Sequence, residues 1–162
     1  MTDHRFYLAH FNVARIKSSL DDPVMAGLVE SLVAMNALAE SSPGFVWRSP
    51  DVDRDEATGQ LDAEGRIVIN FSVWEDLASL YDFVYRSAQA GVAARRRDGF
   101  VRLTDMSIAL WWVRAGYQPS IDEALARLEH LRHHGPSPAA FAFTQTYRPP
   151  RETADVPERV GS

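Results

Sequence analysis

The chain has 162 residues, a net charge of −5 and no cysteine, with 46% hydrophobic and 24% charged residues. This length and composition are those of one globular domain with one core. The missing cysteines exclude disulfides, iron–sulfur clusters and cysteine-ligated zinc, and the negative charge argues against a nucleic-acid binder. Since no apolar run is long enough to span a bilayer and the first residues carry no secretory signal, we expect a cytoplasmic protein that does not contact membranes.

The first half of the chain predicts three strands and two helices. Successive side chains of residues 6–14 would point to opposite faces of a strand, and one of these faces is more hydrophobic than the other. Asp22 and Pro23 are typical of a helix start, and apolar residues then recur at helical spacing up to residue 41. Residues 45–48 form a short aromatic strand and residues 66–74 a longer alternating one, and the second helix occupies residues 75–97.

The second half adds an apolar strand, a short helix and a last strand. The strand is expected at residues 108–113. Ser120 with Glu123 three residues later is a capping box for the helix that follows, and residues 140–147 predict the final strand. The domain is expected to cover residues 1–148, with a disordered tail at 149–162.

The first six elements have the order β-α-β-β-α-β, which is the split βαβ motif of an α+β, ferredoxin-like domain. Two helices on one face of an antiparallel sheet leave the other face bare, and here that face is apolar. A second copy of the chain is the economical cover, so we expect a homodimer in which two sheets pack face to face as a dimeric α+β barrel. The extra C-terminal helix and strand would then contact the partner.

Five segments together resemble an uncharacterised bacterial domain family of the dimeric α+β barrel superfamily, which is related to the antibiotic biosynthesis monooxygenases. They are residues 11–15 (FNVAR), 36–48 (NALAESSPGFVWR), 72–75 (SVWE), 83–87 (FVYRS) and 110–113 (LWWV). The resemblance spans residues 6–147 and supports the expected fold. It implies several activities, because the superfamily holds cofactor-free monooxygenases of polycyclic phenols, heme proteins, isomerases and members with no known reaction.

The resemblance implies catalytic roles for Asn70 and Trp74. In the cofactor-free monooxygenases an Asn and a Trp four residues later contact the substrate, with a Tyr and an Arg nearby. Asn70 and Trp74 have this spacing, and strand alternation puts both on one face. Tyr85 and Arg86 on the next helix are expected at the mouth of the site as substrate-binding residues. An amide at Asn70 can stabilise a phenolate or peroxy anion, although a structural Asn bonded to neighbouring polar groups explains the residue as well.

Polar residues of the first strand can join this site. His10 and Asn12 share the more polar face of their strand, and they can converge with Asn70 and Ser72 from a neighbouring strand. His10 is the expected general base, because imidazole titrates near neutrality; a purely structural histidine is the alternative. Asn12 and Ser72 are expected to bind substrate.

The four tryptophans provide flat apolar surface for an aromatic ligand, or for the core. Trp111 and Trp112 are adjacent in a strand and must point to opposite faces, so only one of them can line a pocket. We expect Trp47 and Trp112 to be substrate-binding residues.

Other charged clusters have simpler explanations. Stabilisation of a helix C-terminus by cationic side chains explains His130, His133 and His134 better than metal binding does. The three consecutive arginines at 95–97 are expected to stabilise the C-terminus of the preceding helix in the same way. The acidic segment that begins at Asp51 lacks the glycine and the terminal glutamate of a calcium loop. No metal site is expected.

The sequence therefore predicts a small oxygenase-like enzyme that needs no cofactor and binds an aromatic or polyketide-type molecule inside the barrel. The alternatives are a non-catalytic binding or structural dimer and a heme protein with His10 as the axial ligand.

Overall fold

The structure is a computed structural model, and it describes residues 6–16, 23, 26–49, 67–89, 100–101 and 107–150. Within this part of the chain, no helix has the length and apolar character needed to cross a membrane. Three features expected from the sequence lie outside it, namely the acidic segment from residue 51, the arginine run at 95–97 and the tail beyond residue 150.

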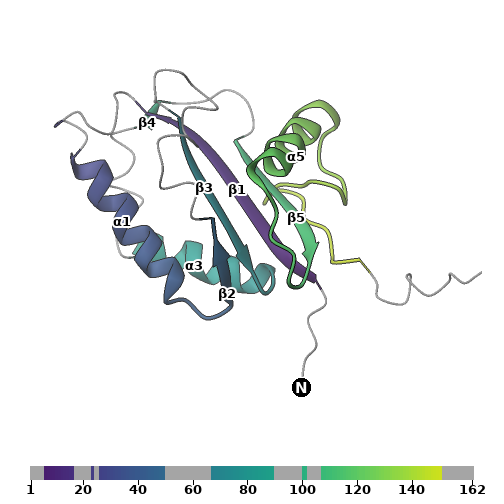
Figure 1. The fold of residues 1–162 in the computed structure, drawn as a ribbon, viewed down its shortest axis with the longest axis horizontal. Helices are drawn as coiled ribbons and strands as arrows, with labels where there is room; N and C mark the ends of the chain where they lie inside the picture. The colour runs from purple at the N-terminus through teal and green to yellow at the C-terminus, as the bar shows by residue number, and fades with distance from the viewer. Residues whose placement is uncertain are drawn as a thin grey trace, which may run out of the picture.

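An antiparallel sheet forms the centre of the domain (Figure 1). The strand order is β2-β3-β1-β4, and β5 also pairs with β1. Because β1 is central and each neighbour runs antiparallel to it, its register with β3 and β5 decides which side chains meet. The strands are β1 (Phe6–Ile16), β2 (Phe45–Arg48), β3 (Ile67–Trp74), β4 (Phe100–Val101) and β5 (Ile108–Arg114).

Three helices pack on this sheet: α1 (Ala26–Glu40), α3 (Leu77–Gln89) and α5 (Ile121–His134). Two of them begin at capping side chains. The Asp76 carboxylate accepts the backbone N–H of Ser79 at 2.8 Å, and the Ser120 hydroxyl accepts that of Glu123 at 3.1 Å. These bonds satisfy donors that a first helical turn leaves without partners, so the helix start expected at Ser120 is confirmed, with Ser120 as its N-cap.

The helices divide between the two faces of the sheet. Figure 1 shows α1 and α3 together on one side and α5 on the other. On the first side, Leu8, Trp74 and Leu110 of the sheet pack against apolar residues of α1 and α3. On the second side, Phe11, Phe71 and Trp111 belong to one cluster, to which α5 contributes three buried residues: Ala124, Leu128 and Leu131. The molecule therefore has two apolar cores separated by the sheet.

The expected α+β fold with an antiparallel sheet is confirmed, with two corrections. The first concerns the face that we expected to be bare. It is covered within a single chain, because the C-terminal helix folds back onto its own sheet, and Phe11, Phe71 and Trp111 have no exposed surface. The burial of these rings therefore does not depend on a partner, contrary to the prediction.

The second correction concerns the last strand, expected at residues 140–147. Only Phe141 makes a bridge to the sheet, pairing with Leu110, and the chain around it forms tight turns. The apolar alternation of this segment serves burial: Phe141 has no exposed surface, and Phe143 and Tyr147 pack against the core on the α1 and α3 side.

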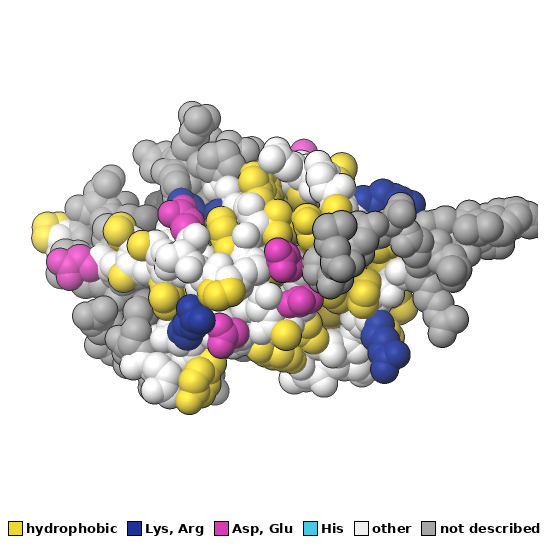
Figure 2. Space-filling view, turned by 90° about the horizontal axis from the view of Figure 1, so that it is seen from below, with side chains coloured by type: hydrophobic (Ala, Val, Ile, Leu, Met, Phe, Trp, Pro, Cys, Tyr) yellow, Lys and Arg dark blue, Asp and Glu magenta, His cyan; other side chains and the backbone are white. Residues whose placement is uncertain are grey.

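The outer surface has mixed character. On the side of the molecule drawn in Figure 2, hydrophobic side chains lie among acidic and basic ones. The large hydrophobic side chains exposed in the described part of the chain include three on α3, namely Tyr81, Val84 and Tyr85.

Candidate functional site

A row of polar side chains crosses the sheet at the junction of β1 and β3. In the register of these strands, His10 lies opposite Ser72 and Asn12 lies opposite Asn70. Side chains directly opposite in an antiparallel pair have Cβ atoms about 5 Å apart on the same face. The predicted convergence of these four residues is thus confirmed as a placement, and we call His10, Asn12, Asn70 and Ser72 the polar row.

The polar row faces α1 and α3. The amide nitrogen of Asn70 lies 4.0 Å from the sulfur of Met35 on α1. Leu8 and Trp74, which have the same parity along their strands as the polar row, belong to the core under these helices. We had expected the site between two sheets, inside a dimeric barrel. That location is wrong, because the parity of β1 and β3 turns the polar positions toward the helices of the same chain.

The two carboxamides of the polar row have few partners. Both are partly buried, yet the only hydrogen-bond contact of Asn70 among the described residues is the weak one to the Met35 sulfur. The Asn12 side chain makes no hydrogen bond to another residue in the described part of the chain. A carboxamide offers two donors and an acceptor, so this pair can bind an oxygen-rich or anionic group.

Trp74 and Ser72 satisfy each other. The indole N–H of Trp74 donates to the Ser72 hydroxyl at 2.9 Å, and its ring stacks on Phe83 with centroids 5.0 Å apart. Trp74 has no exposed surface. In this arrangement Trp74 supports the polar row from the core, so the substrate contact expected of it requires its neighbours to move.

His10 is the member of the polar row whose side chain is an acid–base group, and it is buried. Its side chain is 8% exposed, and its ring centroid lies 6.1 Å from that of Phe143. The Phe143 ring in turn packs against the ring of Tyr81 on α3, with the two centroids 5.4 Å apart. An aromatic layer therefore covers the imidazole on the side of the C-terminal segment.

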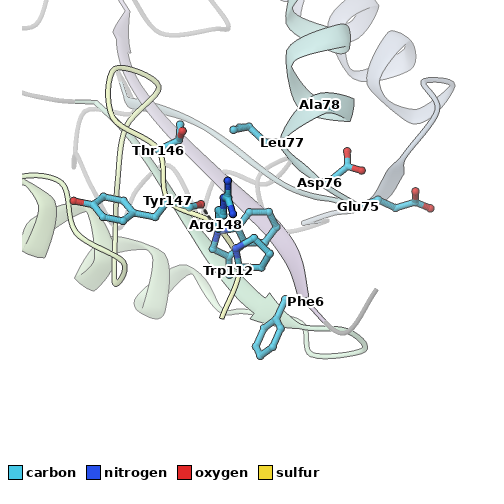
Figure 3. Close-up of a pocket in the computed structure, with 10 residues that line it drawn as sticks. Phe6, Glu75, Asp76, Leu77, Ala78, Trp112, Thr146, Tyr147 and Arg148 are labelled. Atoms are coloured by element: carbon cyan, nitrogen blue, oxygen red, sulfur yellow. Dashed lines mark hydrogen bonds between the residues drawn. The ribbon is translucent and has the colours of Figure 1, made fainter. Parts of the chain in front are cut away.

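An open groove of about 470 Å³ lies next to Trp112 and the start of α3 (Figure 3), and none of the four polar-row residues lines it. Trp112 lines it, and its indole N–H donates to the Tyr147 carbonyl at 2.9 Å. Trp112 pairs with Leu8 in the β1–β5 register. His10 is the next residue of β1 on the same face, about 7 Å along the strand from Leu8. The groove also includes Phe6 and, from the start of α3, Glu75 and Asp76.

Trp111 points the other way, as adjacent residues of a strand must. It has no exposed surface and donates its indole N–H to Glu123 on α5 at 3.2 Å. The prediction that the two tryptophans point to opposite faces is confirmed, and Trp112 is the one that lines the groove.

Three predicted substrate-binding residues do not join the polar row. Trp47 packs edge-on against Phe71, in the cluster on the α5 side of the sheet. Tyr85 is 65% exposed on α3, and Arg86 pairs with Asp82 on the helix surface at 3.1 Å. The register shift between Phe45 and Trp47 places Trp47 opposite Val73 on the α5 side, and Tyr85 and Arg86 lie on the exposed surface of α3.

Two residues that contact the polar row were not assigned to it from the sequence. Met35 comes from the last turns of α1 and lies against Asn70, and Phe143 comes from the C-terminal segment and lies against His10. Each read as an ordinary apolar position, because only tertiary packing brings these distant segments over β1 and β3.

A second groove, of about 440 Å³, shares Phe6 and Trp112 with the first and extends toward α5. There the Tyr117 hydroxyl donates to Glu123, and this bond, together with the negative charge of the carboxylate, raises the pKa of Tyr117 above its ordinary value. Arg114 lies over the Phe6 ring with its guanidinium carbon 5.4 Å from the centroid.

The C-terminal histidines follow the helical spacing expected of them. The rings of His130 and His134 are 4.6 Å apart, and His133 lies 3.1 Å from the Glu129 carboxylate. Within the described ranges, no three histidine or acidic side chains come together as metal ligands do.

The fold and the polar row together define an α+β domain with an antiparallel sheet and a candidate site between that sheet and its first two helices. The chain belongs to the family described as Domain of unknown function (DUF3291), whose model matches residues 7–157. The comparison with curated proteins gave no match.

Two solved structures are similar at low identity. SnoaB, a cofactor-independent oxygenase from Streptomyces nogalater, is 13% identical, with a TM-score of 0.46 over 69% of this chain and 95% of that one. The NE2512 protein of unknown function from Nitrosomonas europaea is 16% identical, with a TM-score of 0.44 over 73% and 99% of the two chains.

Proposed function

We propose that this protein binds a small aromatic or polyketide-type molecule at the polar row and oxidises it with dioxygen without a cofactor. The observation that carries the proposal is the pair Asn12 and Asn70. These two partly buried carboxamides lie side by side, and the one hydrogen-bond contact that either makes in the described part of the chain is the weak one from Asn70 to the Met35 sulfur. Burying amides without strong partners costs free energy, so a bound ligand is a natural partner for them.

In the proposed reaction His10 acts as general base on a substrate with an acidic methylene or phenol group. It removes a proton from a methylene that lies between two aryl rings, and the resulting anion is delocalised onto the oxygen atom attached to the ring system. Asn70 and Asn12 donate hydrogen bonds to that oxygen and stabilise its negative charge.

Dioxygen then takes up the electrons of the carbanion and forms a hydroperoxide at the same carbon. Loss of water from the hydroperoxide leaves a carbonyl. The methylene loses two hydrogens and four electrons; one oxygen atom becomes the carbonyl, and the other leaves as water with both hydrogens. No metal or organic cofactor is needed for this balance.

The test is dioxygen consumption with a panel of anthrones and naphthols. We expect turnover by the wild type and a loss of about a hundredfold in Asn70→Ala, which is the usual effect of removing an oxyanion donor. His10→Gln should lose activity to a similar degree. Asn36→Ala on α1 is the matched control, because it removes the same carboxamide from outside the polar row.

Two results would overturn the proposal. One is the absence of turnover with every member of the panel, together with no quenching of tryptophan fluorescence by naphthol. The other is a Soret band in the purified protein that is lost in His10→Gln, which would support the heme alternative.

The proposal includes a homodimer, although its interface must differ from the one expected. Since α5 occupies the sheet face of its own chain, a partner would contact the exposed apolar side chains of α3 instead, among them Tyr81, Val84 and Tyr85. Sedimentation equilibrium should give twice the chain mass at micromolar concentration, and Tyr85→Glu should lower the mass to one chain. A wild type that sediments as one chain contradicts this part.

A further inference from the structure

The C-terminal segment after α5 is fixed to the sheet at two points. Phe141 exchanges both backbone hydrogen bonds with Leu110 of β5, each at 2.8 Å. Further along, the Tyr147 carbonyl accepts the indole N–H of Trp112 at 2.9 Å. The residues between these two anchors are therefore held over the face of the sheet that carries the polar row.

Between the anchors the chain makes a tight turn. The backbone N–H of Gln145 donates to the Ala142 carbonyl at 3.1 Å, so residues 142–145 form a β-turn. Phe143 is the first central residue of this turn, and it is partly buried although the residue after it, Thr144, is exposed. The turn thus directs one aromatic ring inward from a short loop that is anchored at both ends.

The Phe143 ring occupies the space between the polar row and α3. It lies 6.1 Å from the His10 ring at an interplanar angle of 46°, and 5.4 Å from the Tyr81 ring at 38°. His10 is 8% exposed, whereas Tyr81 is 43% exposed. Phe143 therefore stands between the proposed base and the outer surface of the molecule.

We propose that Phe143 determines which substrates reach the polar row, because the turn 142–145 that carries it limits the size of the ring system that can approach His10. This inference rests on the proposed function for its substrate. The aromatic ring of Phe143 lies next to the His10 ring, and the ring of Tyr81 lies next to that of Phe143. A ligand bound beside these rings is expected to be a flat fused-ring phenol, whose face meets an aromatic ring and whose oxygen reaches the two amides.

The covering role is tested without any substrate, by the rate at which diethylpyrocarbonate modifies His10 in the full chain. Removing the ring in Phe143→Ala should raise this rate by about fivefold, because the imidazole becomes open to solvent. Phe143→Leu, which keeps an apolar side chain and is the milder change, should give a smaller rise. The exposed His133 is an internal reference in every variant.

Tyr117→Ala is the matched control for the labelling. It also truncates an aromatic ring to alanine, but on the α5 side, and it should leave the His10 rate unchanged. If neither Phe143 variant changes the rate while both give the wild-type circular dichroism spectrum, Phe143 does not cover His10 and the inference is wrong.

The size selection is tested by turnover. Phe143→Ala should raise the ratio of kcat/KM for a three-ring anthrone to kcat/KM for a two-ring naphthol by about tenfold, as expected when a bulky wall is removed from an apolar site. An unchanged ratio with faster labelling of His10 overturns the selection. If His10 becomes accessible but even the wild type consumes no dioxygen, it is the proposed function that fails, while the covering role of Phe143 is supported.

Discussion

The two faces of the sheet are built from the same strands but have different compositions. On the α5 side, every inward position of β1 and β3 between Ala9 and Val13 or between Ile69 and Val73 is apolar, and the rings of Phe11, Phe71 and Trp111 are fully buried. On the α1 and α3 side, apolar residues at one end of these strands give way to the polar row. Since stability alone favours apolar residues at such positions, the polar face is the one that points to function.

The largest expected effect belongs to the α5 side. Phe71→Ala should lower the free energy of unfolding by about 3–5 kcal/mol, because it leaves a cavity among rings that contact it from three directions. Urea denaturation followed by tryptophan fluorescence measures the loss. A loss below about 1 kcal/mol would mean that this face is much less tightly packed than its burial indicates.

The next largest effect concerns Ser72, the member of the polar row that is hydrogen-bonded to the buried Trp74. Ser72→Ala removes the acceptor of the buried Trp74 N–H and should cost about 1–3 kcal/mol. In the double variant Ser72→Ala/Trp74→Phe no indole N–H remains, so the two losses should not add. Additive losses in the urea experiment would show that this hydrogen bond contributes little.

The two amides should behave in the opposite way. Asn12→Leu and Asn70→Leu should each change the free energy of unfolding by less than about 1 kcal/mol, because neither amide makes a strong hydrogen bond to the described residues. Both variants should nevertheless lose dioxygen consumption. A loss of stability above about 2 kcal/mol with activity retained would make the amides structural and would remove the contrast between the two faces.

The smallest effect concerns the surface hydrogen bond from Tyr117, in the turn after β5, to Glu123 of α5. The pKa of Tyr117 is raised by its bond to Glu123, so the protonated phenol is the form that stabilises the fold. This contribution is complete below the ordinary tyrosine pKa of about 10 and is lost as the pH rises through the higher folded-state value. Wild type should therefore unfold at a slightly higher urea concentration than Tyr117→Phe at pH 8, and the gap should narrow as the pH is raised above the ordinary tyrosine pKa. A gap that does not change with pH would argue against the bond.

Much of the local structure follows from nearby residues. The strand at Phe45–Arg48 lies where its aromatic pattern predicted it, and the last helix begins after its expected N-cap, Ser120. The pairing of His10 and Asn12 with Ser72 and Asn70 was also expected, because strand alternation is a local property. The two-residue strand β4 was missed, since so short a segment carries no periodicity.

The sequence by itself determined most of the helices and strands, their order and the parity of the long strands, because these depend on spacing within a few residues. Only the tertiary structure decided which face of the sheet each helix covers, and this choice moved the candidate site from a barrel between two sheets to the space under α1 and α3. The physical reason is that a strand pattern distinguishes two faces without saying what packs on either one. Helix α5 and Phe143 come from the far end of the chain, and their contacts with β1 depend on burial that no local pattern records.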